Sequence, residues 1–173
     1  MRLEDHIEDI PDFPKPGIVF KDITPLFLDP EALRYAIDEL AEYARSRSVD
    51  YVVSAEARGF VLGAAVAAAA GAGFILARKP GKLPRAISSV EYQLEYGVDA
   101  LEVHADAVRD GARVLVHDDL LATGGTAGAL CDLVEQAGGV VAGCAFVIEL
   151  AFLHGRDRLK GYDVRSLVVV DDE

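Results

Sequence analysis

The chain has 173 residues and a mass of 18.5 kDa, which is enough for one domain whose buried core needs neither disulfides nor metals. Apolar residues make up 51% and charged residues 27% of the chain, which excludes an intrinsically disordered protein. The formal net charge of −12 argues against a general nucleic-acid role, because phosphate backbones would be repelled except at a concentrated basic patch.

The compartment is predicted from the N-terminal sequence and the cysteines. MRLEDHIEDIPDF carries acids where a signal peptide has a basic flank and an apolar stretch, so we expect a cytoplasmic protein. No apolar run is long enough to span a bilayer, and no membrane partner is expected. Cys131 and Cys144 lack CxxC spacing and lie in a predicted helix and strand, so we expect reduced, buried thiols with structural roles.

The N-terminal segment, residues 1–28, contains prolines that prevent a long helix, yet it is too apolar for a free tail. We therefore expect an irregular segment that packs against the rest of the protein. Asp29 and Pro30 then supply a helix N-cap and a proline at the first helical position. Apolar residues at helical spacing follow, which predicts a helix over about 30–47.

Strands and helices alternate through the rest of the chain. Apolar runs predict strands at 51–55, 73–78, 113–117, 140–150 and 165–170. Helices are expected at 60–70, 100–109 and 126–137. Residues 79–99 are rich in Pro, Gly and Ser, which favours a flexible lid containing a β-hairpin. Residues 1–173 are therefore predicted to form one α/β domain, with a doubly wound, mostly parallel five-stranded sheet and flanking helices.

The sequence HDDLLATGGTAG, residues 117–128, follows the third predicted strand. In an open α/β sheet, ligands bind beyond the carboxyl ends of the strands. Thr123-Gly124-Gly125-Thr126 would present free backbone N–H groups at a helix N-terminus, which suits a phosphate. Asp118 and Asp119 would repel a phosphate but can bind hydroxyl donors or a divalent cation. The motif therefore predicts a ligand with a phosphate on one side and a diol on the other, such as a ribose 5-phosphate.

Parts of this pattern also have plainer interpretations. A Gly-Gly pair after a strand can be only a helix cap, and adjacent aspartates can be only a turn. The basic segment RKPGKLPR, residues 78–85, fits a solvated loop when taken alone. The common nucleotide fingerprints are missing from the sequence: there is no GxxxxGK[ST], and Gly71-Ala72-Gly73 lacks the third glycine of GxGxxG because Leu76 stands there.

VLVHDDLLATGGT resembles the phosphoribosyl-diphosphate signature of type I phosphoribosyltransferases. The chain is similar to the adenine-using members of that family nearly end to end, through IPDFPKPGIVFKDITPLFLDP (10–30), EARGF (56–60), RKPGKLP (78–84), LEYG (94–97) and IEL with GRDRL (148–159). The resemblance implies a purine salvage enzyme that converts adenine and 5-phosphoribosyl 1-diphosphate to AMP and pyrophosphate. It also implies a homodimer, and Mg²⁺ bound mainly through substrate and water, with no direct protein ligand.

The resemblance also implies a role for individual residues. Asp118 and Asp119 would hold the ribose hydroxyls. The other groups that bind phosphoribosyl diphosphate would be Ala122, Thr123, Gly124, Gly125 and Thr126 for the 5′-phosphate, and Arg58, Arg78, Lys79 and Lys82 for the diphosphate. Adenine would be bound by Val19, Phe20 and Leu120, with residues 1–28 as a hood over the base. The catalytic residues would be Arg58 and, on a lid of residues 79–99, Glu95 and Tyr96.

Three of these residues have plainer alternatives, and two histidines need a separate interpretation. Phe20 also fits ordinary packing of the hood, and Glu95 with Tyr96 also fits a solvated hairpin tip. His117 stands where the family usually has Val or Ile; we expect its ring to point into the core, where it needs a hydrogen-bond partner, rather than into the site. His104 is a candidate for a contact with pyrophosphate.

Two other functions stay open on the sequence. A 6-oxopurine phosphoribosyltransferase, acting on hypoxanthine, guanine or xanthine, would require a different hood over the base. A non-catalytic regulator that senses phosphoribosyl diphosphate and binds nucleic acid would require a basic face, whereas this chain is acidic. We therefore expect small-molecule substrates and no nucleic-acid partner.

Overall fold

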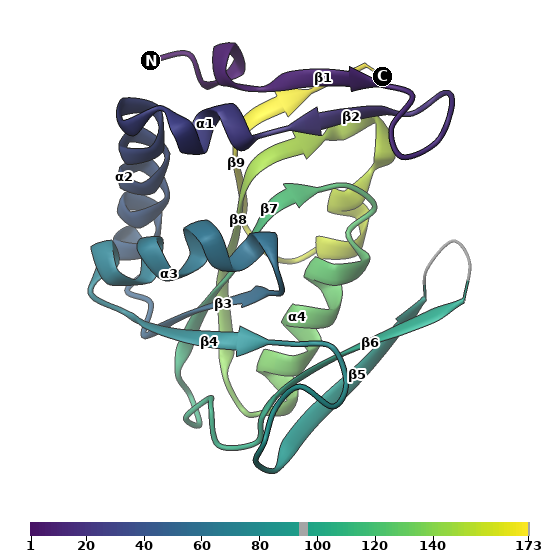
Figure 1. Cartoon of the computed structure of the whole chain (residues 1–173). Helices are drawn as coiled ribbons and strands as arrows, with labels where there is room; N and C mark the ends of the chain where they lie inside the picture. Colours follow the sequence, from purple (N-terminus) through teal and green to yellow (C-terminus); the bar gives the residue numbers. More distant parts are fainter. Residues whose placement is uncertain (94–96, 173) are drawn as a thin grey trace.

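The computed structural model describes residues 1–93 and 97–172. Over these residues the central sheet has five parallel strands in the order β4-β3-β7-β8-β9 (Figure 1). The bounds of the strands are Tyr51–Ala55 for β3, Gly73–Ala77 for β4, Arg113–Leu121 for β7, Val140–Leu150 for β8 and Val164–Val170 for β9. This confirms the predicted α/β fold with a parallel five-stranded sheet.

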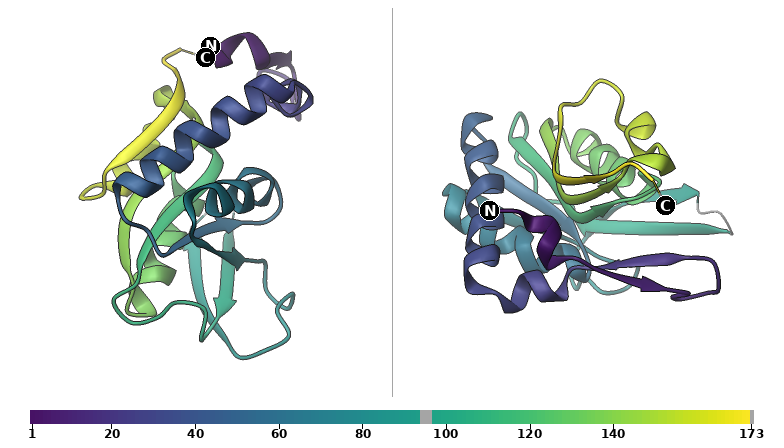
Figure 2. Two further views of the ribbon diagram at one scale, coloured as in Figure 1. Left: turned by 90° about the vertical axis from the view of Figure 1, so that its left-hand side faces the viewer. Right: turned by 90° about the horizontal axis from the view of Figure 1, so that it is seen from above.

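Helices cover both faces of this sheet (Figures 1 and 2). They are α2 (Pro30–Ser46) and α3 (Arg58–Ala70) on one face and α4 (Gly125–Gln136) on the other. Neighbouring residues of a strand point to opposite layers: Val52 packs in the apolar cluster with α2 and α3, and Val53 in the cluster with α4. Among the described residues, no helix has the length and apolarity needed to cross a bilayer.

The N-terminal segment differs from its prediction, because it is regular rather than irregular. It contains η1 (Leu3–His6), the antiparallel pair β1 (Glu8–Pro11) and β2 (Val19–Asp22), and α1 (Thr24–Leu28). Pro14 and Pro16 lie in the turn between the two strands, where no hydrogen bond of the ladder is lost. The predicted packing of the segment is confirmed, since Leu3 and Leu26 are buried in the core.

The predicted helix at 100–109 is wrong. Strands β5 (Ile87–Gln93) and β6 (Val98–His104) form an antiparallel hairpin that extends away from the central sheet (Figure 1). Leu101 and Val103 are both buried, so the apolar residues of this segment repeat every two positions, as in a strand. Pairing with residues 87–93 therefore prevails over the local helical propensity of DALEVHADA.

Candidate functional site

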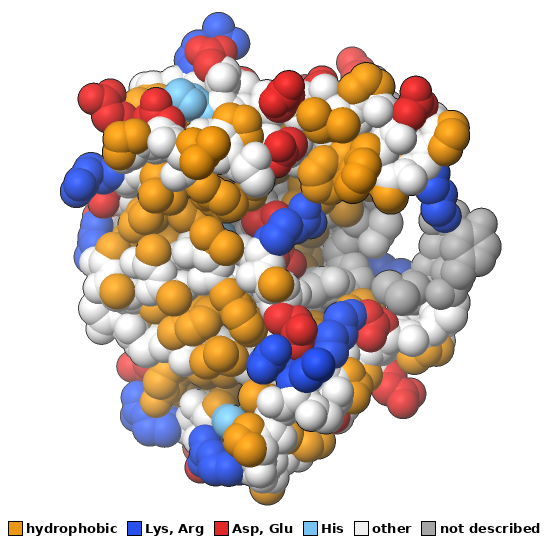
Figure 3. All heavy atoms as spheres, viewed as in Figure 1, with side chains coloured by type: hydrophobic (Ala, Val, Ile, Leu, Met, Phe, Trp, Pro, Cys, Tyr) orange, Lys and Arg blue, Asp and Glu red, His pale blue; other side chains and the backbone are white. Residues whose placement is uncertain are grey.

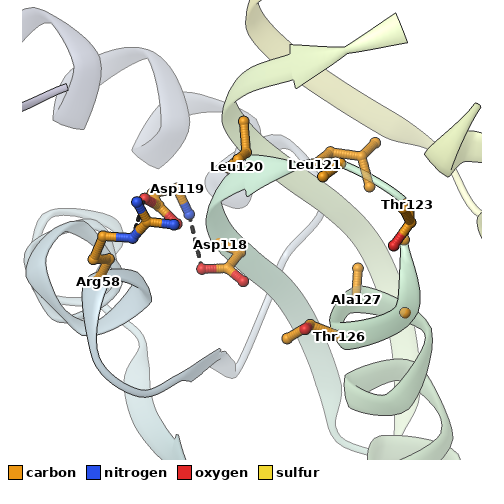
Figure 4. Close-up of a pocket in the computed structure, with 11 residues that line it drawn as sticks. Arg58, Asp118, Asp119, Leu120, Leu121, Thr123, Thr126 and Ala127 are labelled. Carbon is orange, nitrogen blue, oxygen red and sulfur yellow. Dashed lines mark hydrogen bonds and ion pairs between the residues drawn. The ribbon is translucent and has the colours of Figure 1, made fainter. Parts of the chain in front are cut away.

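The candidate site lies where β7 ends between α3 and α4 (Figure 4). A cavity of about 190 Å³ is lined by Arg58 and by the continuous segment 118–127. A second cavity of about 200 Å³ shares Arg58, Asp118, Asp119 and Thr126 with the first and adds the residues Glu56, Lys79 and Tyr92 on its other side. Together they form one polar hollow at the carboxyl edge of the sheet, which is where ligands of open α/β folds bind.

The glycine loop, residues 122–126, consists of the connection after β7, residues 122–124, and the first two residues of α4, which begins at Gly125. Gly124 has a φ of +82°, which favours glycine, and a Cβ atom at this position would lie 2.4 Å from the carbonyl oxygen of Gly155. The helix start leaves backbone N–H groups without intrahelical partners beside the cavity. Thr123 and Thr126 lie on either side of the two glycines of this loop (Figure 4). The structure therefore brings together the predicted phosphate-binding residues.

The two aspartates lie inside β7, because this strand runs four residues beyond its predicted end at residue 117. Asp119 is only 5% exposed, and its Oδ2 lies 3.1 Å from Nε of Arg58. The backbone N–H of Asp119 donates a hydrogen bond of 2.9 Å to Oδ1 of Asp118. Burial, followed by the charge of Asp119, raises the pKa of Asp118 well above its ordinary value. Hydroxyl donors from a ligand would stabilise these crowded carboxylates.

Three of the predicted diphosphate-binding cations contact carboxylates. Arg58 pairs with Asp119, as described above. Arg78 has its Nε 3.3 Å from Oε1 of Glu56, and the Lys79 side chain pairs with Asp99 on β6. Lys82 is exposed on the same loop but is not among the described residues that line the two cavities.

Sequence reasoning missed three residues of the site: Glu56, Asp99 and Tyr92. Glu56 accepts a hydrogen bond of 2.6 Å from the backbone N–H of Lys79, and its position directly after the strand 51–55 could have indicated it. The Tyr92 hydroxyl lies 3.4 Å from Oδ2 of Asp99, and the Tyr92 ring packs against Gly125. No local pattern indicates Asp99, because its contacts depend on the pairing of β5 with β6.

The predicted adenine-binding residues come from two elements. Val19 and Phe20 lie on β2, and Leu120 lies on β7 beside Asp119 at the cavity wall. The guanidinium of Arg58 is 5.5 Å from the centroid of the Phe20 ring, so the N-terminal hairpin reaches the edge of the site. Two of the predicted catalytic residues, Glu95 and Tyr96, lie outside the described residues.

The histidines and cysteines lie away from the site chemistry. His117 is fully buried, and its Nδ1–H donates a 2.9 Å hydrogen bond to the carbonyl of Ala145, so its ring points into the core as expected. Burial lowers the pKa of His117 to about 4. His104 instead lines a separate cavity near β4, so its predicted contact with pyrophosphate gains no support from its position. Cys131 and Cys144 are buried free thiols, 3.8 Å apart.

No group of three or more His, Cys, Asp or Glu side chains within residues 1–93 and 97–172 is arranged to hold a metal ion. The carboxylates of Glu56, Asp118 and Asp119 do line one cavity, together with Arg58 and Lys79. Such a mixture of charges suits a ligand that carries both hydroxyl groups and phosphate groups.

Comparisons with known proteins match this chain over nearly its whole length. Residues 27–172 match the phosphoribosyl transferase domain family. The chain is 61% identical over 171 residues to an adenine phosphoribosyltransferase of Rubrobacter xylanophilus, and the match covers 98% of this chain and 92% of that protein.

Two solved structures of adenine phosphoribosyltransferases are similar to this fold. The protein from Thermoanaerobacter pseudethanolicus matches with a TM-score of 0.94 and 52% identity, covering 98% of this chain and 100% of that one. The protein from Saccharomyces cerevisiae matches with a TM-score of 0.91 and 38% identity, covering 95% and 96% of the two chains. The yeast structure is a complex with adenine and D-2,5-dideoxy-2,5-imino-altritol 1,6-bisphosphate.

Proposed function

This chain belongs to the phosphoribosyl transferase family, and on that premise we propose how its residues act. The protein transfers the phosphoribosyl group of 5-phosphoribosyl 1-diphosphate to adenine, giving AMP and pyrophosphate in purine salvage. Adenine is favoured over a 6-oxopurine as the substrate, because relatives with 54–61% identity over nearly the full length are named adenine phosphoribosyltransferases. The observation that supports the site assignment is that one cavity joins the partly buried Asp118 and the buried Asp119 to a glycine loop at a helix start.

The sugar phosphate binds at the end of β7 in this proposal. Asp118 and Asp119 accept hydrogen bonds from the 2′- and 3′-hydroxyls of the ribose, which offsets the repulsion between the two carboxylates. The 5′-phosphate binds the backbone N–H groups of residues 122–126 and the hydroxyls of Thr123 and Thr126. Its charge is stabilised by the positive end of the α4 dipole.

The diphosphate binds Arg58, Arg78, Lys79 and Lys82. When the bond between C1′ and the diphosphate breaks, positive charge develops on the ribose and negative charge on the leaving pyrophosphate, so cations at this point stabilise the transition state. The contacts of Arg58 with Asp119 and with the Phe20 ring support its proposed catalytic role. The ligand would replace Asp119, Glu56 and Asp99 as the partner of these cations.

Adenine binds between the N-terminal hood, residues 1–28, and the end of β7. Phe20 stacks on one face of the base, Leu120 lies against the other, and backbone groups near Val19 recognise the exocyclic amine. Residues 79–99 act as the lid, with Glu95 handling the proton of adenine N9 and Tyr96 helping to exclude water. The proximity of Arg58 to Phe20 supports the hood, because it brings the Phe20 ring of β2 within 5.5 Å of a side chain that lines the cavity.

Mg²⁺ is the proposed cofactor. The residues present fit this ion, because the carboxylates of Glu56, Asp118 and Asp119 line the cavity beside the cations that would bind the diphosphate. The ion would be held mainly by oxygens of the substrate and by water, as is usual for Mg²⁺, and these carboxylates would accept hydrogen bonds from its water molecules. When bound, it neutralises charge on the diphosphate.

The protein is proposed to act as a homodimer in the cytoplasm. Apolar side chains gather over α2, α3 and β4 on the face seen in Figure 3. Exposed apolar residues of these elements include Val61 on α3 and Leu76 on β4, which are 52% and 46% exposed. Such a patch beside an edge strand suits the same surface of a second copy. Light scattering should show a dimer, and a V61K/L76K variant should be monomeric.

The free thiols of Cys131 and Cys144, 3.8 Å apart, favour a reducing compartment.

Initial rates with adenine, hypoxanthine, guanine and xanthine, each with 5-phosphoribosyl 1-diphosphate and Mg²⁺, test the proposed function. Release of pyrophosphate should be fastest with adenine, by on the order of a hundredfold or more, because the base site pairs with the exocyclic amine. Equal rates with guanine would support the 6-oxopurine alternative. No turnover with any purine, combined with salt-sensitive binding of DNA or RNA, would favour the regulator.

A further inference from the structure

The segment GRDRL, residues 155–159, is not among the described residues that line the two cavities. It forms the short helix η3 (Gly155–Leu159), which lies directly behind the glycine loop. A Cβ atom on Gly155 would be 2.3 Å from the carbonyl oxygen of Ala122, and one on Gly124 would be 2.4 Å from the carbonyl oxygen of Gly155. The two backbones are therefore in direct contact, without side chains between them.

One end of η3 is held to the sheet by a charged cluster. Glu149, near the end of β8, is only 4% exposed, and its carboxylate accepts two hydrogen bonds from Arg156, of 2.6 Å from Nε and 2.7 Å from Nη2. The Ser166 hydroxyl on β9 donates a third, of 2.6 Å. Arg156 first, and then Ser166, lower the pKa of Glu149 against the effect of burial. The other end of η3 is held by Leu159, which is buried in the core.

We propose that Glu149 and Arg156 form a clamp that positions the loop 122–126 for binding the 5′-phosphate. Arg156 fixes η3 against β8, and the neighbouring Gly155 fixes the backbone of Ala122 and Gly124 from behind. Neither Glu149 nor Arg156 is among the described residues that line the two cavities, so both are positioning residues rather than ligands of the substrate. This inference rests on the proposed function of the loop.

The effect on binding should exceed the effect on stability. The Arg156 side chain is 50% exposed, so solvent screens its side of the ion pair, whereas the buried Glu149 carboxylate would keep only the Ser166 hydroxyl as a partner in R156M, which predicts a moderate loss of stability. A phosphate held by several backbone N–H groups, by contrast, requires that all of them converge on one point. A small displacement of the loop weakens several of these hydrogen bonds at once, and so weakens binding of the phosphate.

Arg165 offers a control for Arg156 that is matched in the exposure of the arginine, although the side chain of its partner Glu39 is 38% exposed and that of Glu149 only 6%. Its side chain is 48% exposed and its Nη2 lies 2.9 Å from Oε2 of Glu39, but this pair joins β9 to α2, away from the glycine loop. R156M should raise KM for 5-phosphoribosyl 1-diphosphate roughly tenfold, with kcat and KM for adenine changed by less than about twofold. R165M should leave all three constants unchanged, and R156K, which keeps the charge but loses the fork of two hydrogen bonds, should be intermediate.

Calorimetric titration with ribose 5-phosphate and with pyrophosphate separates positioning from general damage. R156M and E149Q should bind ribose 5-phosphate roughly tenfold more weakly and pyrophosphate as the wild type does, because only the former uses the loop. Equal binding of ribose 5-phosphate by R156M, R165M and the wild type would overturn the clamp, as would an equal loss for both ligands. If R156M does not fold, R156K and E149Q provide the same comparison. If the wild type turns over no purine, the proposed function fails, while the titration still decides on the clamp.

Discussion

The two halves of the site are built differently. The half at the end of β7 offers mainly backbone groups, which are held in place by a glycine in the left-handed region and by η3 packed behind it. The half formed by α3 and the segment after β4 offers charged side chains, three of which are already paired with an acid: Arg58 with Asp119, Arg78 with Glu56, and Lys79 with Asp99.

This difference indicates how each half responds to a ligand. The backbone half is formed in advance, so the 5′-phosphate binds without rearrangement of side chains. The side-chain half exchanges one anionic partner for another, so the binding of diphosphate is offset by the loss of an existing ion pair. Changes to the half at the end of β7, including Asp119, should therefore be severe, and changes to Glu56 or Asp99, which pair only with cations of the second half, should be mild.

The largest effect is expected for Asp119→Asn, which tests the half that is formed in advance. The amide cannot accept hydroxyl donors as a carboxylate does, and it releases Arg58 from the pair seen at 3.1 Å. We expect kcat/KM for 5-phosphoribosyl 1-diphosphate to fall on the order of a hundredfold or more, with the melting temperature nearly unchanged. Steady-state kinetics with D106N as the control check this, and unchanged kinetics in D119N would remove Asp119 from the site.

His117 directly precedes Asp118 in β7, and its burial predicts that stability depends on pH. Its folded pKa of about 4 lies below the ordinary value of 6.5, so the unfolded chain takes up a proton that the folded chain does not. This contribution is constant above pH 6.5 and stability is lost as the pH falls from there toward 4, by about 3 kcal/mol in full.

Urea unfolding of the wild type and His117→Val between pH 7 and pH 4 measures this loss. The valine leaves a cavity whose penalty does not depend on pH, so the two stability curves should converge as the pH falls. The control is His154→Asn, because His154 is exposed and asparagine tolerates its left-handed backbone. Parallel curves for the wild type and His117→Val would show that His117 is not held neutral in the fold.

Much of the half at the end of β7 can be predicted from local sequence, whereas the ion pairs of the side-chain half cannot. An apolar strand, two aspartates and a glycine turn lie within residues 114–126, so their order alone indicates a phosphate next to a diol. The contact of Lys79 with Asp99 depends on the hairpin β5–β6, and Gly124 meets Gly155 only through the path of β8. The predicted helix at 100–109 failed for the same reason, because the pairing of distant segments decided its structure.

Gly124→Ala tests whether the backbone of the glycine loop is fixed. Alanine is strained at a φ of +82°, and its Cβ would lie 2.4 Å from the Gly155 carbonyl oxygen, so we expect a loss of about 2 kcal/mol in the free energy of unfolding. KM for 5-phosphoribosyl 1-diphosphate should rise at least about tenfold. The control is Gly128→Ala in α4, where the nearest atom would be 3.9 Å away and alanine should stabilise the helix. Equal effects of both variants on KM would contradict a fixed loop.

The smallest effect is expected for Asp99→Asn. This variant tests whether the diphosphate replaces an acidic side chain as the partner of a cation in the side-chain half. Removing the partner of Lys79 leaves that cation free for the diphosphate, so pyrophosphate should bind roughly two- to fivefold more tightly, the range expected for partly exposed pairs. The gain should shrink at high salt because screening weakens the original pair. Asp106→Asn, which breaks the exposed pair of Asp106 with Arg85, should leave pyrophosphate binding unchanged. Weaker binding in D99N would instead mean that Asp99 orients Lys79 for the ligand, and the two halves would then be equally formed in advance.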